Sequence, residues 1–274
     1  MSEKQFEHIK VEINKENNYA IISINRPEKL NALHTITLRE IADALEEMAF
    51  NKSVRCVVLR GTKEYTKKPA FSAGADLSIR GHPAIDPKNL MDQSHAMYIR
   101  QKYYDIIEKF PKPLIAAVDG YALGGGFELA LVCDIVIASK RSTFGFPEIK
   151  RGIAPFNGGT QRLIRNLGKI RTKTMIFFGE HYKAEEMYDW GIISFLVDEE
   201  KFEDFVHQKA SWLGNAPTKS LFVIKKAIDY GSQIPLNLGL QFEYLGYAIN
   251  SQSKDVIEGV TAFLQKREPK FTGE

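Results

Sequence analysis

Two glutamates of this 274-residue chain stand beside glycine-rich segments, where acid–base chemistry could occur. Glu128 lies two residues after the glycine row of GYALGGGFELALVCD, and Glu148 follows a proline in FGFPEIKRG. Each glycine costs conformational entropy and disfavours a helix relative to alanine, so a row of three needs a geometric reason. The row separates a predicted strand, PLIAAVDG, from a predicted turn and helix, YALGGG and FELALVCD. It therefore marks a strand-to-helix junction.

This junction suits an anion. A helix N-terminus presents free backbone N–H groups, and glycine lets a ligand approach them closely. A dinucleotide site or a P-loop is the obvious rival, but the sequence has neither GxGxxG nor GK[ST]. A tight packing turn is the alternative that this stretch alone leaves open.

A second small-residue turn, PAFSAGADL, occupies residues 69–77, after a predicted strand and a polar loop. Two such turns could each aim one N–H at the same oxygen, as in enzymes that hold a thioester carbonyl while it gains negative charge. Glu128 and Glu148 would flank that site as an acid–base pair. Because two nearby carboxylates disfavour double ionisation, we expect one of the two pKa values to be raised.

The elements that must position these residues fall into two regimes. Short β-branched strands are expected at 7–14, 19–25, 54–60, 113–119 and 134–139, with helices at 35–50 and 88–109. Beyond about residue 158 a single strand is expected at 192–198, and helical spacing recurs at 202–213, 218–229, 236–249 and 254–265. The pattern predicts a layered α/β core. We place it, with the active site, in residues 1–200, followed by a helical section, 201–274, that is not an independent domain.

Composition narrows the class of protein. A net charge of +3 is too small to indicate nucleic-acid binding. The start, MSEKQFEHIK, lacks an apolar signal core and no apolar run is long enough to span a membrane, so we expect a cytoplasmic protein without a membrane segment. Cys56 and Cys133 lie in apolar stretches that favour reduced thiols, and the histidines lack the spacing of metal ligands.

The chain resembles the enoyl-CoA hydratase/isomerase (crotonase) superfamily from about residue 8 to its end. The resemblance lies in FSAGADL, GYALGGGFELALVCD and FGFPEIKRGIAPFNGGTQRL, with INRPEKLNAL near the start and GVTAFLQKREPKF near the end. It implies an α/β spiral of ββα units and a C-terminal helical trimerisation section, commonly within a hexamer made as a dimer of trimers. It also implies a reaction, the reversible addition of water across the 2,3-double bond of an enoyl-CoA thioester. Coenzyme A would be part of the substrate, and no metal or other cofactor would be needed.

Residue-by-residue matching to the family gives the expected site. The oxyanion-hole N–H groups would be those of Ala75 and Gly125, and the catalytic glutamates would be Glu128 and Glu148. We assign Glu148 to the proton at Cα and Glu128 to positioning the water, although the sequence does not distinguish these roles. By the same matching, the CoA nucleotide would lie near Lys29, Leu30, Ala73, Asp76 and Leu77, with Phe263 and Lys266 closing over it.

Other functions within the family remain open. Isomerases and hydrolases use the same oxyanion hole, so the fold alone does not give the reaction. Retention of both glutamates favours a hydratase, since a double-bond isomerase can work with one base. Some relatives bind RNA through a lysine-rich helix, but the matching helix at 37–50 carries acidic residues that would repel phosphate, namely Glu40, Asp43, Glu46 and Glu47.

One segment departs from the family pattern. Where relatives usually have glycine after the proline of the last large motif, this chain has Phe156, followed by Asn157. Phenylalanine disfavours a positive φ, and its ring must either turn into the core or narrow the acyl end of the pocket. The second alternative favours short substrates such as crotonyl-CoA or 3-hydroxypropionyl-CoA. The helix at 90–110 is expected to face the core rather than the pocket through Met91, Met97, Tyr98, Tyr103 and Tyr104.

Overall fold

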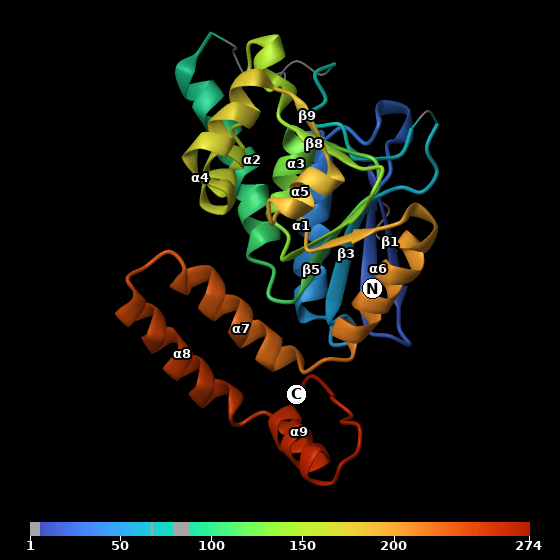
Figure 1. Ribbon diagram of the computed structural model, residues 1–274, viewed down its shortest axis with the longest axis vertical. Coiled ribbons are helices and arrows are strands. Elements are labelled where there is room, and N and C mark those ends of the chain that lie inside the picture. The colour runs from blue at the N-terminus through green and yellow to red at the C-terminus, as the bar shows by residue number, and fades with distance from the viewer. Residues whose placement is uncertain (1–5, 67, 79–87) are drawn as a thin grey trace.

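Strands of the first two thirds of the chain divide between two sheets in the computed structural model, which describes residues 6–66, 68–78 and 88–274 (Figure 1). The larger sheet has the order β1 (Ile9–Asn14), β2 (Tyr19–Ile24), β3 (Cys56–Gly61), β5 (Leu114–Val118), β7 (Ile135–Ser139) and β10 (Phe195–Val197). The smaller sheet has the order β4 (Ala70–Ser72), β6 (Tyr121–Leu123), β8 (Thr143–Gly145) and β9 (His181–Lys183). The pairs β1–β2 and β8–β9 are antiparallel, and all other pairs are parallel.

Three successive turns of the chain each add one strand to each sheet and then a helix. The repeating units are β3–β4–α2, β5–β6–α3 and β7–β8–α4. The helices are α1 (Thr35–Phe50), α2 (Leu90–Glu108), α3 (Gly125–Leu131) and α4 (Gly159–Phe178), and the short α5 (Ala184–Asp189) leads from β9 towards β10. This arrangement confirms the expected spiral of ββα units. Two local predictions were wrong, because Tyr121–Leu123 forms a strand rather than a turn and α3 begins at Gly125 rather than Phe127.

Both faces of the larger sheet are covered. Its central strands are continuous apolar runs because parallel strands between two layers bury both sets of side chains. On one face, Leu38 of α1 and Val57 of β3 belong to the same core. On the other face, α6 (Glu199–Gly214) packs Phe202 and Val206 against Val58.

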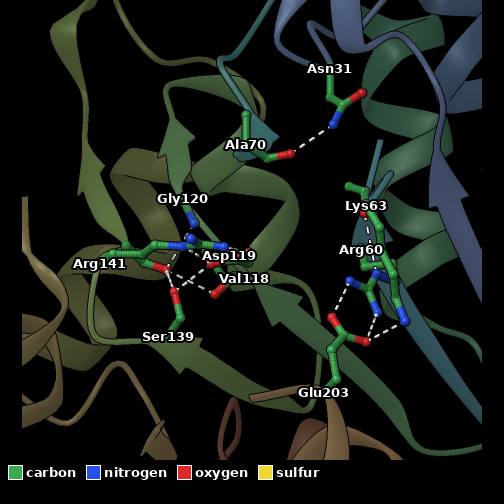
Figure 2. Close-up of polar contacts among 12 residues, drawn as sticks. Asn31, Arg60, Lys63, Ala70, Val118, Asp119, Gly120, Ser139, Arg141 and Glu203 are labelled. Carbon is green, nitrogen blue, oxygen red and sulfur yellow. Dashed lines mark hydrogen bonds and ion pairs between the residues drawn. The ribbon is translucent and has the colours of Figure 1, made fainter. Parts of the chain in front are cut away.

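Charged contacts fix α6 to this sheet. The guanidinium of Arg60 donates two hydrogen bonds, of 2.8 and 2.6 Å, to the carboxylate of Glu203, and Lys63 Nζ lies 2.6 Å from the same group (Figure 2). On the neighbouring strands, Ser139 Oγ donates to Asp119, which also pairs with Arg141. Helix α6 therefore packs as part of the spiral.

The remaining helices project from the spiral. Helices α7 (Thr218–Gly231) and α8 (Leu236–Asn250) lie side by side, and α9 (Lys254–Leu264) follows them, at the end of the molecule farthest from α3 (Figure 1). Lys225 Nζ of α7 lies 2.8 Å from Asp134 Oδ2, and Arg55 Nη1 donates to the carbonyl of Phe271. Their exposed apolar side chains include Phe222, Ile224, Ile228, Leu236, Leu238, Phe242, Leu245, Ile249, Ile257, Val260 and Phe263.

Some side chains lie elsewhere than the sequence pattern suggested. Tyr104 of α2 is buried, but Met91 and Tyr98 are exposed, so only the C-terminal half of this helix joins the core. Glu40 is buried and accepts backbone N–H bonds from residues 7 and 8, so it does not belong to an exposed acidic face. Cys56 is a buried free thiol and Cys133 a partly buried one. Within the described ranges, no helix has the length and apolar character needed to cross a membrane.

Candidate active site

The glycine row brings two distant segments against the start of α3. Gly124 has φ 51° and ψ −124°, and a Cβ built on it would lie 2.5 Å from Glu148 Oε1. A Cβ on Gly126 would lie 2.4 Å from the carbonyl oxygen of Ser72, at the end of β4. Only glycine at these positions permits this approach. The glycine row therefore has a geometric cause, which is the close approach of Glu148 and Ser72 to this backbone.

Ala75 and Gly125 border one space. A Cβ built on Gly125 would stand 3.6 Å from the nitrogen of Ala75, and one on Gly74 would stand 3.5 Å from the nitrogen of Gly125. Leu33 pairs with Ala75 in a parallel β-bridge, which holds this turn in place. Within the described residues, neither of these two N–H groups donates a hydrogen bond. Two free donors on backbones this close together suit an oxyanion hole.

Glu128 is a buried carboxylate held by backbone and side-chain donors. It is 1% exposed. Oε1 accepts from the backbone N–H groups of Asn157 and Gly159, both at 2.8 Å, and Oε2 accepts from Asn157 Nδ2 at 2.9 Å. Burial raises the pKa of Glu128, while these three hydrogen bonds favour the ionised form.

Glu148 lies in a different environment. It is placed by the short 3-10 helix η2 (Pro147–Arg151), whose first residue is the proline that precedes it. Its Oε2 is buried and has no hydrogen-bond partner among the described residues. Burial raises the pKa of Glu148 to about 7, and the nearby charge of Glu128 adds to the rise. Near neutral pH this group can therefore hold or release a proton.

Aromatic packing fixes the backbones that carry the two carboxylates. The rings of Phe127 and Phe146 stack with centroids 5.0 Å apart, one residue from Glu128 and two residues from Glu148. Tyr104 Oη of α2 donates a 2.9 Å hydrogen bond to the carbonyl of Gly125. These contacts hold α3 and η2 in register.

Five of the residues assigned to coenzyme A lie on two joined turns. The first turn contains η1 (Pro27–Lys29) and Leu30, and the carbonyl of Leu30 accepts a 3.0 Å hydrogen bond from the N–H of Ala73. Asn31 Nδ2 donates to the carbonyl of Ala70, which anchors this turn to β4 (Figure 2). The structure therefore brings these residues together beside Ala75, namely Lys29, Leu30, Ala73, Asp76 and Leu77.

Three further assignments are not brought into this cluster within one chain. Phe263 lies on α9 and Lys266 follows it, at the end of the molecule opposite α3 (Figure 1). The ring of Phe156 is 60% exposed, which contradicts the first of its two alternatives, that the ring turns into the core. Its carbonyl accepts a 3.4 Å hydrogen bond from Gln101 Nε2 of α2.

Sequence reasoning missed two residues that shape the site. Arg26 lies in the INRPEKLNAL motif and forms an ion pair with Asp76, but the motif alone did not reveal that partner. Asn157 was noticed as a departure from the family pattern, yet its contact with Glu128 joins residues 29 positions apart. That contact could be found only from the fold.

Known proteins resemble nearly the whole of this chain. The family model described as enoyl-CoA hydratase/isomerase matches residues 14–274. The short-chain-enoyl-CoA hydratase of Clostridium acetobutylicum is 35% identical over 256 residues, which cover 93% of this chain and 94% of the relative. The 1,2-epoxyphenylacetyl-CoA isomerase of Escherichia coli is 35% identical, over 92% of this chain and 94% of the relative. The crystal structure of an enoyl-CoA hydratase from Bacillus anthracis has a TM-score of 0.88 at 33% identity, and the comparison covers 98% of this chain and all of that one.

Proposed function

Because the chain belongs to the enoyl-CoA hydratase/isomerase family, we propose that it adds water reversibly across the 2,3-double bond of a short-chain enoyl-CoA thioester. The observation that carries this proposal is the pairing of two unlike carboxylates beside two free N–H donors. Glu128 accepts three hydrogen bonds, whereas Glu148 has an unpartnered oxygen and a pKa of about 7. A hydratase needs both an acceptor and a donor of protons, and these environments separate the two roles.

The thioester oxygen would bind to the N–H groups of Ala75 and Gly125. As hydroxide character develops at the attacking water, the π electrons of the double bond move towards this oxygen, and an enolate forms. Donors already in place stabilise that charge without rearranging. Removal of one such donor typically costs about 3 to 4 kcal/mol of barrier.

The two glutamates would divide the elements of water. Ionised Glu128 accepts a proton from the water while the hydroxyl oxygen forms its bond to Cβ. Protonated Glu148 then delivers its proton to Cα as the enolate collapses back to a thioester. The next water to enter can relay the proton from Glu128 to Glu148, which restores the starting state. The reaction is redox-neutral, so the proposal includes no redox cofactor, and coenzyme A enters as part of the substrate.

Two binding proposals accompany this reaction. The joined turns that carry Lys29 and Ala75 would hold the CoA portion through backbone contacts, as the family resemblance implies. Phe263 and Lys266 could close over it only from a second copy of the chain, because α9 lies far from α3 in its own. We therefore propose a trimer, or a dimer of trimers. We also propose that the protein acts in the cytoplasm and binds no nucleic acid.

Isomerisation is the second candidate, because one relative at 35% identity is an isomerase. An isomerase moves a proton between two carbons and needs no bound water, so one acid–base group is enough. The second, differently tuned carboxylate favours hydration.

Product analysis separates these reactions. Crotonyl-CoA and 3-hexenoyl-CoA are incubated with the protein in water labelled with oxygen-18, and the products are examined by mass spectrometry. Hydration predicts that crotonyl-CoA gains one labelled oxygen, whereas movement of the double bond in 3-hexenoyl-CoA without label would favour an isomerase. Rates for acryloyl, crotonyl, hexenoyl and decenoyl thioesters, and for 3-hydroxypropionyl-CoA dehydration, then define the chain length. Higher activity on decenoyl-CoA than on crotonyl-CoA would contradict the short-chain proposal.

A further inference from the structure

We propose that the side chain of Asn157 is a positioning residue that holds Glu128 as a carboxylate and fixes the direction in which it faces the reacting water. The catalytic meaning of this inference rests on the proposed function. The contact itself does not, because it exists in the free protein.

Asn157 bonds to both oxygens of Glu128. Its backbone N–H donates to Oε1 at 2.8 Å and its Nδ2 donates to Oε2 at 2.9 Å, while Gly159 adds a second bond to Oε1. The side-chain amide makes the only hydrogen bond to Oε2 among the described residues. A carboxylate held at one oxygen can rotate about its last bond, but one held at both cannot. The amide therefore fixes the plane of the carboxylate.

The other end of the same amide has no partner. Asn157 Oδ1 is buried and accepts no hydrogen bond from the described residues. A buried acceptor without a hydrogen bond is unfavourable. Packing alone does not explain why this position holds an asparagine with such an acceptor. Reversal of the amide would place Oδ1 against Oε2 of Glu128, where two acceptors repel. The bond to the carboxylate thus determines the orientation of the amide.

The segment that carries Asn157 is held from two helices. Gln101 of α2 donates to the carbonyl of the preceding residue at 3.4 Å. Arg162 of α4 donates to the carbonyl of Asn157 at 3.1 Å and pairs with Glu108 of α2. The donor to Glu128 is therefore braced on both sides.

Charges from each packed element act on Glu128. Glu148 from η2 opposes its ionisation, Arg162 from α4 favours it, and the Tyr104 hydroxyl of α2 is neutral, since burial raises the pKa of that phenol. Burial of Glu128 also opposes ionisation. The hydrogen bond from the Asn157 amide favours the ionised form of Glu128, so its removal should raise the pKa of Glu128.

The first test replaces Asn157 by leucine, which has nearly the same volume but no donor. The backbone N–H of residue 157 remains in this variant. We expect the acidic limb of kcat/KM for crotonyl-CoA to move upwards by about one pH unit. The loss of one hydrogen bond to a charged carboxylate raises its pKa by about that amount. We also expect kcat to fall about tenfold with little change in KM. Asn157→Asp should move the limb further, since it places a like charge beside Glu128.

A second readout does not depend on activity. The protonation of Glu128 in the free protein is followed by infrared titration, with Glu128→Gln subtracted to isolate its band. Wild type and Asn157→Leu are compared, and Asn157→Ala replaces the leucine variant if that variant does not fold. An upward shift of the titration midpoint supports the inference. A lower kcat with an unmoved pH profile and an unmoved infrared midpoint would overturn it. If the wild type hydrates no thioester, the proposed function fails while the titration still decides whether Asn157 controls Glu128.

Discussion

The guanidinium of Arg26 lies 2.7 Å from the carboxylate of Asp76, and this ion pair joins the turn that carries Lys29 to the turn that carries Ala75. Arg26 also donates to the carbonyl of Ala32. The pKa of Asp76 is lowered to about 2, first by its hydrogen bond with Ser78 and then by Arg26, despite burial. The pair therefore stays ionised over the pH range of ordinary assays, and it fixes the residue next to Ala75, whose N–H is the proposed oxyanion donor.

Loss of Arg26 should uncouple the two turns. Arg26→Met leaves the buried carboxylate of Asp76 without its cation, and such a loss typically destabilises a protein by about 3 to 5 kcal/mol. We expect lower stability in urea and a reduced kcat/KM. The double variant Arg26→Met, Asp76→Leu should recover much of the stability because it leaves no unpaired charge, but not the activity. If the double variant unfolds as easily as the single one, the ion pair is not what joins these turns.

Glu148→Gln and Glu128→Gln should each lower kcat for crotonyl-CoA hydration by about two to four decades, because each removes one proton-transfer group. Binding of a non-reactive acyl-CoA, measured by calorimetry, should largely persist. Near-normal hydration by either variant would remove that residue from the mechanism.

The pKa of Glu148 predicts how activity varies with pH. Since the proposed mechanism needs Glu148 protonated to supply Cα, kcat/KM for hydration should fall as pH rises through about 7. Measurement of kcat/KM from pH 5 to pH 9 tests this limb. If kcat/KM of the Glu148→Gln variant still falls through about pH 7, a group other than Glu148 causes that fall.

The same raised pKa affects stability. The folded protein holds a proton on Glu148 between its ordinary value of 4.5 and about 7, where the unfolded chain has released it. This contribution is complete below pH 4.5 and is lost as pH rises through about 7. Urea unfolding at pH 5 and pH 8 should therefore show a smaller decline in Glu148→Gln than in the wild type.

Replacement of Phe156 by glycine should raise activity on C8 to C10 enoyl thioesters relative to C4. The ring is exposed beside the segment that holds Glu128, so its loss leaves no core cavity and would widen the acyl end if the ring narrows it. Phe50→Ala provides a control, since this phenylalanine is also exposed but ends α1. An unchanged chain-length profile would assign Phe156 to another role.

The apolar faces of α7, α8 and α9 predict self-association. Exposed aliphatic and aromatic side chains over three successive helices exceed what a monomer usually leaves in water. We expect a closed cyclic assembly, because identical faces of this kind are commonly buried by symmetry. Sedimentation equilibrium at micromolar concentration should give a multiple of three subunit masses. A monomer mass would contradict the prediction.

The local signals in the sequence were sufficient for the layered α/β core and for the glycine row, whereas the spiral of ββα units was implied by the family resemblance. Strands such as β3 and β5 are continuous apolar runs whose pattern needs no partner to be recognised. The glycines at 124 and 126 indicated that other atoms lie close to this backbone, but the sequence did not show that these atoms belong to Glu148 and Ser72. Helix α2 was misjudged because its aromatic residues suggested a buried face, whereas the first half of that helix is exposed.

Contacts between distant segments were beyond the sequence. Nothing near Glu40 indicates that its carboxylate accepts the N–H groups of residues 7 and 8. The difference between Glu128 and Glu148 likewise depends on donors that arrive from residues 157 and 159. The sequence could identify both carboxylates as candidates, but only the fold distinguishes their surroundings.

The ion pair between Lys225 and Asp134 bears on the proposed assembly of subunits. It ties the first projecting helix to the start of β7, and the hydrogen bond from Arg55 to the carbonyl of Phe271 ties the tail to β3. Because the middle of α7 and the tail after α9 are both attached to the spiral, α7 to α9 form a preorganised arm. Its orientation is set within one chain, so in the proposed assembly a second copy would dock against it with little loss of conformational entropy. Lys225→Met should loosen that arm and slow reassembly after dilution, while the spiral that carries Glu128 stays folded.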